Sequence, residues 1–207
     1  MATSASDTSN TFAFILVPQV ALSVTSASIG DQVTVVGYGF TASSTVTVYF
    51  DSAVVLTTST SNLGTFSTPL TIPQSQRGSH TIRILDVAVG DFHLAAFTVL
   101  QKLTVSPSDA TVGAPLTIAA SGFAASQTVT VYFDEVSVAT TATDSLGGFT
   151  LTSFAMPASA SGSHSIRVTD TSGNSHTVSV NTKQSTTFGP ASGPIGTKVT
   201  ITGTGFR

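Results

Sequence analysis

The sequence contains no cysteine, no tryptophan and little charge of either sign. Without cysteine no disulfide can hold the fold together, and the redox compartment cannot be inferred from disulfides. Seven Lys and Arg against ten Asp and Glu give a net charge of −3, and charged residues make up only 8% of the chain. Such a surface has no positive field to attract phosphates, so nucleic-acid binding is disfavoured. Most of its polar side chains must be serine and threonine, which suit strands.

Helical periodicity and long hydrophobic runs are missing as well. No stretch of ten or more residues has the apolar spacing of a helix. The apolar segment at residues 12–17 is too short to span a membrane, so we expect no membrane insertion. Because no Lys or Arg precedes Arg77, we do not interpret this segment as a secretory signal peptide, which would begin with a basic region.

One phrase occurs three times at a fixed period. The copies VTVVGYGF, LTIAASGF and VTITGTGF end at Phe40, Phe123 and Phe206, so the period is 83 residues. Solenoid and propeller repeats usually have periods of about 20 to 50 residues and share one continuous core. A unit of 83 residues is long enough to close a core of its own, which predicts a string of small domains.

Within each copy, apolar and polar residues alternate. In T-V-T-V-Y-F the residues Val46, Val48 and Phe50 share one face, and residues 128–133 repeat the pattern. This period of two is typical of a strand with one buried face. Clusters of Gly, Asn, Asp and Ser, such as residues 61–64, supply turns between the strands. About seven short strands per unit predict an all-β fold of tandem immunoglobulin-like antiparallel β-sandwich domains.

Each phrase ends in a glycine followed by a phenylalanine. A glycine at the end of a strand permits positive φ or a bulge, which would turn the next side chain into the sandwich. Residues 37–42 also fit the dinucleotide pattern G-x-G-x-x-A, but that pattern requires a following helix and a strand is expected here. We therefore predict a structural motif and no bound cofactor. The motif residues are Gly39, Phe40, Gly122, Phe123, Gly205 and Phe206.

The run from G-x-x-V-T-V through G-x-G-F to V-T-V-Y-F-D, with a later L-G-x-F and G-S-H-x-I-R, resembles a known family. It is similar to the IPT/TIG-type and related immunoglobulin-like repeats of bacterial and archaeal surface proteins, over residues from about 20 to 207. The resemblance implies the fold. For function it implies only a class, because such repeats serve as stalks, adhesin spacers, sheath or filament units and accessory domains of secreted hydrolases.

The repeat frame predicts four segments. Residues 1–19 are a polar tail with a strand equivalent to the last strand of a preceding repeat, residues 20–102 and 103–185 are repeats 1 and 2, and residues 186–207 are the first two strands of an incomplete third repeat. Either the sequence is a segment of a longer array, or it is a subunit that polymerises through incomplete ends. In the second case an N-terminal strand apolar on both faces would add to a partner sheet. The residues of this candidate assembly strand are Phe12, Phe14, Ile15, Leu16 and Val17.

Candidate chemistry is sparse and duplicated. No G-x-S-x-G motif occurs, and an active site is normally one place, so we expect no enzyme, no catalytic residue and no cofactor. A zinc site would need a third and usually a fourth ligand beside the histidines, and the nearest aspartates more readily organise hairpin turns. We predict no metal site. The residues considered are His80, His93, His164, His176, Asp86 and Asp170.

These features favour a non-enzymatic extracellular or cell-surface module, with copies of itself or adjacent repeats as partners. The alternative is a recognition module that binds a glycan or a surface protein, or an accessory domain of a secreted hydrolase. Tyr49 and Tyr132 are equivalent and are expected to point outward, where they would contact a glycan or, more simply, a neighbouring strand.

Overall fold

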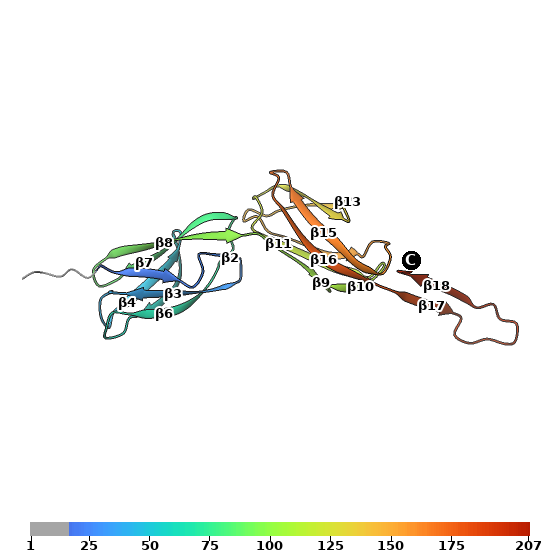
Figure 1. Ribbon diagram of the computed structural model, residues 1–207, viewed down its shortest axis with the longest axis horizontal. Coiled ribbons are helices and arrows are strands. Elements are labelled where there is room, and N and C mark those ends of the chain that lie inside the picture. The colour runs from blue at the N-terminus through green and yellow to red at the C-terminus, as the bar shows by residue number, and fades with distance from the viewer. Residues whose placement is uncertain (1–16) are drawn as a thin grey trace, which may run out of the picture.

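The computed structural model describes residues 17–207, which fold into strands β1 to β18 and contain no helix. Three units follow one another in line along the long axis of the molecule (Figure 1). The first two are β-sandwiches of eight strands each, and the third is a two-stranded hairpin. Among the described residues no helix is long and apolar enough to cross a membrane. The protein therefore has the predicted all-β fold of tandem immunoglobulin-like sandwiches.

Repeat 1 pairs a three-stranded sheet, β1-β3-β6, with a five-stranded sheet, β2-β8-β7-β4-β5. All neighbours are antiparallel except β2 and β8, which pair in parallel. The first strand segment of the repeat is therefore divided between the two sheets, with β1 in one and β2 in the other. The sequence predicted antiparallel pairing throughout, and the parallel pair departs from that prediction. The strands are β1 Gln19–Leu22, β2 Ser26–Ser28, β3 Gln32–Tyr38, β4 Thr45–Phe50, β5 Ala53–Ser59, β6 Phe66–Thr71, β7 Gly78–Asp86 and β8 Asp91–Leu100.

Repeat 2 repeats this topology with sheets β14-β11-β9 and β10-β16-β15-β12-β13, in which β10 and β16 form the parallel pair. Its strands are β9 Lys102–Ser106, β10 Asp109–Thr111, β11 Pro115–Ser121, β12 Thr128–Phe133, β13 Val136–Ala142, β14 Phe149–Ala155, β15 Gly162–Asp170 and β16 Ser175–Lys183.

Each sandwich has its own hydrophobic core. In β4 the side chains of Val46, Val48 and Phe50 are buried, whereas Thr47 and Tyr49 between them are half-buried. The same alternation runs through β12. Fully burying a side chain of this size contributes about 1.5–3 kcal/mol, so the two faces that meet between the sheets stabilise each repeat.

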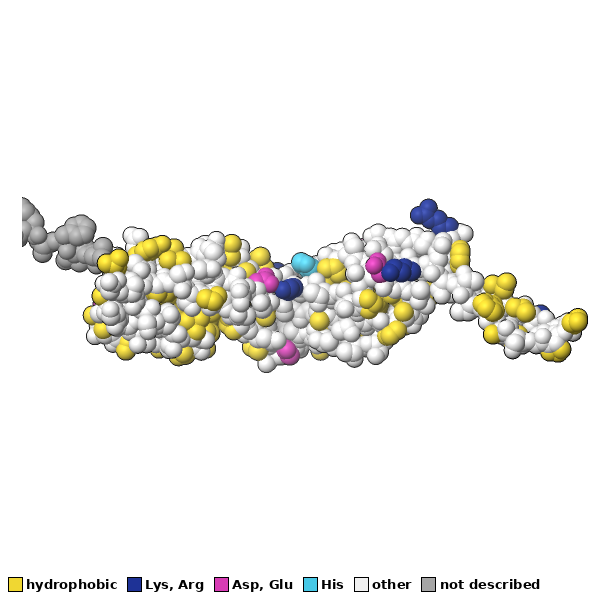
Figure 2. Space-filling model, turned by 90° about the horizontal axis from the view of Figure 1, so that it is seen from below, with side chains coloured by type: hydrophobic (Ala, Val, Ile, Leu, Met, Phe, Trp, Pro, Cys, Tyr) yellow, Lys and Arg dark blue, Asp and Glu magenta, His cyan; other side chains and the backbone are white. Residues whose placement is uncertain are grey.

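The third unit consists of β17 Ser185–Gly189 and β18 Thr200–Thr204. Phe188 pairs with Ile201 across the hairpin, as Val105 pairs with Ile118 in repeat 2. Ile118 is fully buried, but Ile201 is 72% exposed. Figure 2 shows hydrophobic side chains gathered on the surface of this last unit. The hairpin thus has the pairing of a repeat without the second sheet that would cover it.

Candidate functional site

The Gly-Phe motif directly follows β3, β11 and β18. The φ angles of Gly39, Gly122 and Gly205 are 74°, 72° and 77°, in the region that favours glycine. Phe40 is 5% exposed and packs edge-on against Phe66 at 5.3 Å between ring centroids. Phe123 is fully buried against Phe149, whereas Phe206 is 54% exposed in the two-stranded third unit.

A buried aspartate joins the Gly-Phe segment to the hairpin on the opposite sheet. The backbone N–H of Thr41 donates to Asp86 Oδ2 at 2.8 Å, and that of Ala88 donates to Oδ1 at 3.2 Å. In repeat 2, Asp170 accepts from the backbone N–H groups of Ala124, Ser172 and Asn174 and from Asn174 Nδ2. Both aspartates organise their hairpin turns as the sequence indicated. The bond to the Gly-Phe segment, 45 residues away in repeat 1, was not foreseen.

A buried threonine holds the other side of the same segment. Thr60 Oγ1 donates to the Thr41 carbonyl at 2.6 Å and accepts from the Ser44 N–H at 2.9 Å. Thr143 makes the equivalent bonds to Ala124 and Gln127. No sequence signal separates these threonines from the many exposed ones, because only their loop position makes them unusual.

A histidine–aspartate pair closes the far end of each sandwich. His80 Nδ1 lies 2.7 Å from Asp51 Oδ2, and His80 Nε2 lies 2.9 Å from the Gln76 carbonyl oxygen. The His80 ring also stacks on Phe50, with 4.8 Å between centroids. The Asp51 Oδ1 atom accepts the backbone N–H of Thr81.

Repeat 2 contains the same arrangement. His164 Nδ1 lies 2.5 Å from Asp134 Oδ2, and its Nε2 lies 2.8 Å from the Ala160 carbonyl oxygen. Burial lowers the pKa of His164, but the bonds to Asp134 and Ala160 outweigh it and raise the pKa above its ordinary value. The histidines therefore pair with Asp51 and Asp134, and not with the Asp86 and Asp170 that stand nearest as candidate ligands in the sequence.

The remaining histidines do not complete a metal site. His93 packs edge-on against Phe40, with 4.9 Å between ring centroids. Between residues 17 and 207, no group of three His, Asp or Glu side chains comes together as metal ligands. Both ring nitrogens of His80 and of His164 already face protein oxygens. These side chains act as structural links in the fold.

The joint between repeats 1 and 2 is one residue long. β8 ends at Leu100 and β9 begins at Lys102, which leaves Gln101 alone between them. Lys102 Nζ binds Asp31 Oδ1 in the β2–β3 turn at 2.8 Å, and both side chains are more than a third exposed. Ser28 Oγ donates to the Gln101 carbonyl at 3.4 Å. The linker is therefore in contact with the body of repeat 1.

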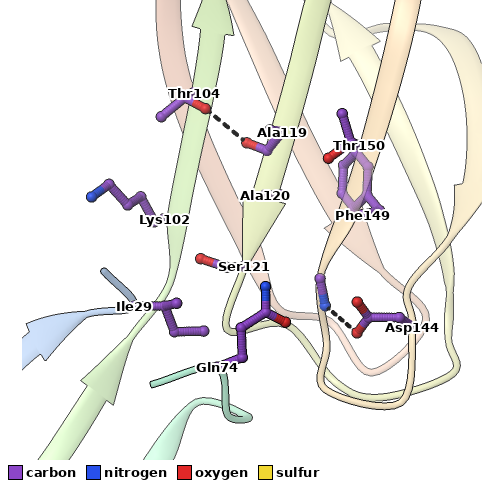
Figure 3. A pocket seen from close by; sticks show the side chains of 11 residues that line it. Ile29, Gln74, Lys102, Thr104, Ala119, Ala120, Ser121, Asp144, Phe149 and Thr150 are labelled. Carbon is purple, nitrogen blue, oxygen red and sulfur yellow. Dashed lines mark hydrogen bonds between the residues drawn. The ribbon is translucent and has the colours of Figure 1, made fainter. Parts of the chain in front are cut away.

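A pocket of about 370 Å³ opens at this joint (Figure 3). Ile29 and Gln74 come from repeat 1, and the other lining residues come from repeat 2. Figure 3 shows Gln74 reaching from repeat 1 toward the side on which Ser121 and Asp144 lie. Asp144 is engaged by the N–H groups of Leu146 and Gly148, so its carboxylate organises its own loop. The pocket holds no nucleophile with a neighbouring base.

The equivalent tyrosines lie on the outer face of the five-stranded sheets, where arginines cover them. Arg83 lies 5.6 Å from the Tyr49 ring centroid and 4.2 Å from that of Phe92. Arg167 lies 4.0 Å from the Tyr132 ring and binds Glu135 through two nitrogens. The tyrosines thus contact neighbouring strands, the simpler of the two expected uses.

The candidate assembly strand falls almost wholly outside the described residues. Phe12, Phe14, Ile15 and Leu16 are not described, and Val17 is 67% exposed.

No protein-family model matches this sequence, and no curated protein matches it. Among solved structures, the chain is similar to the Yersinia pseudotuberculosis adhesin InvE, with 12% identity over 80% of this chain and 58% of that one and a TM-score of 0.37. It is also similar to the C-terminal 282-residue fragment of intimin, in complex with the intimin-binding domain of the translocated intimin receptor, with 14% identity, coverage of 83% and 66%, and a TM-score of 0.36.

A third similar structure is a tetra-tandem repeat in the extending region of a large adhesion protein, with 20% identity, coverage of 83% and 50%, and a TM-score of 0.38. This chain thus spans between half and two thirds of the length of these structures. All three likenesses concern the fold alone. The immunoglobulin-like architecture rests on the chain's own sheets and cores, and membership of the IPT/TIG type stays a prediction.

Proposed function

We propose that the chain is a non-enzymatic structural module of an extracellular or cell-surface protein, in which tandem repeats hold a fixed distance as a stalk, filament, sheath or adhesin spacer. The observation that carries this proposal is the packing of the linkers. A spacer transmits length and direction only if its joints resist bending. Short linkers that pack against the flanking domains limit such bending.

The glycine of the Gly-Phe motif makes this packing possible. A Cβ atom at Gly122 would lie 2.9 Å from the Leu100 carbonyl oxygen and 3.2 Å from Gln101 Cα. At the next joint, a Cβ at Gly205 would lie 2.8 Å from the Lys183 oxygen and 3.1 Å from Gln184 Cα. Two successive joints therefore share one geometry, in which the loop of the incoming repeat rests on the linker before it. Any side chain at these positions would push the two apart.

The duplicated chemistry supports the same proposal. The polar links of repeat 1 through Asp86, Thr60 and His80 have counterparts in repeat 2. Each of these side chains bonds to loop backbone within its own repeat, so each serves to hold the ends of a sandwich in shape. Repetition of such links is what a spacer requires.

Small-angle X-ray scattering of the intact chain tests the proposal. We expect the maximum dimension of a straight array, and we expect Gly122→Ala to broaden the distance distribution because its Cβ meets the linker backbone. Gly113→Ala is the matched control, since Gly113 has a φ of 83° but nothing within 4 Å of an added Cβ. Both substitutions strain a positive φ, and only Gly122→Ala disturbs the joint. Equal scattering from the two variants would contradict the proposal.

A recognition module is the second candidate, and one surface favours it. Phe92 and Leu94 are 44% and 64% exposed on β8, and Phe92 lies 5.8 Å from the Tyr49 ring. Exposed aromatic rings beside an arginine suit the stacking of sugar rings. Binding of the chain to a glycan panel, lost in a Tyr49→Ala and Tyr132→Ala double variant, would support this candidate over the spacer.

Head-to-tail assembly through the ends is a finer form of the spacer proposal. Its support is the open face of the third unit, where Phe188 and Val199 are 67% and 52% exposed. Strand addition from a partner would extend this two-stranded sheet at its edge and help build the missing part of the repeat. We expect deletion of residues 11–17 to abolish any higher-order assembly of the chain, measured by analytical ultracentrifugation. Unchanged assembly would exclude the N-terminal segment as the donor.

A further inference from the structure

The hydrogen bonds of His80 and His164 link two parts of each repeat. His80 Nε2 faces the carbonyl oxygen of Gln76, and Nδ1 faces a carboxylate oxygen of Asp51. The same holds for His164 between Ala160 and Asp134. Each ring therefore joins the loop that precedes it to the turn that carries the aspartate.

The aspartate of each pair has a lowered pKa. Burial raises the pKa of Asp51, but the bonds from His80 and from the Thr81 N–H outweigh it and lower the pKa. For Asp134 the Ser165 N–H is the main cause of a lowered pKa, which burial opposes and the His164 bond reinforces. Each histidine thus lies beside a carboxylate, and its other ring nitrogen faces a loop carbonyl oxygen.

The loop tied down by each ring faces the next unit of the array. Residues 72–77 connect β6 to β7, and Gln74 from this loop lines the pocket at the first joint. In repeat 2, residues 156–161 connect β14 to β15, and the Ser161 N–H donates to the Gly205 carbonyl of the third unit at 2.7 Å. We call each ring with its two hydrogen bonds the histidine latch. The latch holds the loop against which the following unit packs.

A leucine from the next repeat lies at this surface. A second pocket, of about 530 Å³, is lined by residues 50–53, the 73–77 loop, Ser79, His80 and, from the β13–β14 turn of repeat 2, Leu146. Leu63 is the equivalent leucine of repeat 1, where the described residues include no preceding repeat. Leu63 is 79% exposed and Leu146 is 42% exposed. Leu146 is less exposed because repeat 1 partly covers it.

We propose that the socket at the end of each repeat, formed by the histidine, its aspartate and the loop that the ring holds, receives the leucine turn of the following repeat, and that loss of the ring's two bonds releases the loop and loosens the joint. The proposal deepens the spacer function and rests on it. The socket of repeat 2 has the equivalent Phe133, Asp134, Pro157 and His164 around a pocket of about 440 Å³. Its partner is the leucine turn of another copy of the repeat.

The charged surroundings of His80 are few. Asp51 lies on the β4–β5 turn, Arg77 lies on the loop itself, and Asp144 and Lys102 line the neighbouring pocket from repeat 2. Asp144 and Lys102 are engaged by backbone N–H groups and by Asp31.

Electron-paramagnetic-resonance distance measurements on the full chain test the proposal. The chain has no cysteine, so Ser67→Cys on β6 and Thr152→Cys on β14 provide two unique label sites on exposed positions of the two repeats. We expect a narrow distance distribution in the parent chain, and one about twofold broader wherever the socket is broken and the packed domains become independent.

Matched variants separate the latch from general damage. His80→Gln should give the broad distribution, and His164→Gln, which alters the other joint, should behave like the parent chain. Leu146→Ser should also broaden the distribution, whereas Leu63→Ser should not, and this pair decides the question if His80→Gln fails to fold. A narrow distribution in every variant would overturn the socket and leave the spacer intact. A broad distribution in the parent chain would overturn both.

Discussion

Repeats 1 and 2 share their interior links and differ on their outer faces. The Thr41 bond to Asp86 has its counterpart in the Ala124 bond to Asp170, although the residue that donates has changed, because only its backbone N–H is used. On the outer face, Arg167 binds Glu135 in repeat 2, whereas Arg83 of repeat 1 packs on Phe92. The repeat is therefore defined by its cores and loop anchors, and its outer sheet faces are free to vary.

Removal of the motif phenylalanine should destabilise a complete repeat far more than the hairpin that follows it. Phe123→Ala should lower the free energy of unfolding of repeat 2 by about 3–5 kcal/mol, because it empties a fully buried site. Phe206→Ala, at the equivalent position of the third unit, should change stability little because Phe206 is 54% exposed. Urea denaturation followed by circular dichroism measures both. Similar losses would show that the third unit is packed as a repeat is.

The two buried aspartates should differ in how much each stabilises its repeat. Asp170→Ala should cost roughly 3 kcal/mol and Asp86→Ala roughly 2 kcal/mol, because Asp170 accepts more hydrogen bonds and its donors would be left unpaired. Amide hydrogen exchange resolves the loss repeat by repeat. An equal or larger loss for Asp86→Ala would contradict this ranking.

Asp170 also predicts how repeat 2 responds to acid. Burial raises its pKa, but the bonds from Asn174, Ala124 and Ser172 outweigh it and lower the pKa. The stabilisation is therefore present above the ordinary aspartate pKa of about 4 and is lost as pH falls through the lowered value. Urea midpoints between neutral and acid pH should fall less steeply in Asp170→Ala than in the parent chain. Parallel profiles would show that Asp170 does not carry this dependence.

A smaller change in stability is expected from His164, as pH rises and not as it falls. Its raised pKa means that its stabilisation is fully present below the ordinary histidine pKa of about 6.5 and is lost as pH rises through the folded-state value. The urea midpoint of repeat 2 should fall as pH rises across that range, and His164→Gln should remove this slope. A slope that survives in His164→Gln would have to come from another group.

The smallest change in stability is expected on the outer faces of the five-stranded sheets. Arg167→Ala breaks an exposed ion pair with Glu135, and such pairs contribute little and are screened by salt. The change in midpoint should be well below that of Asp170→Ala and should shrink when sodium chloride is added. A large, salt-independent loss would mean that the packing of Arg167 on Tyr132 outweighs its charge.

The sequence predicted the sheets better than the links between their ends. Alternation in β4 placed Val46 and Val48 in the core, because the period of two depends only on hydrophobicity. Alternation cannot say which of many threonines is buried, so the role of Thr60 was missed. Nor could spacing predict that His80 meets Asp51, because the pairing of β4 with β7 brings together two residues that are 29 positions apart.

If successive repeats form one stiff array, they tumble in solution as one body. Nitrogen-15 relaxation of the labelled chain measures this tumbling. We expect the amides of residues 20–100 and those of residues 103–183 to fit a single, strongly anisotropic rotational diffusion tensor. Two separate tensors, each typical of an isolated domain, would show that the joint at Gln101 is flexible and that the array is not stiff.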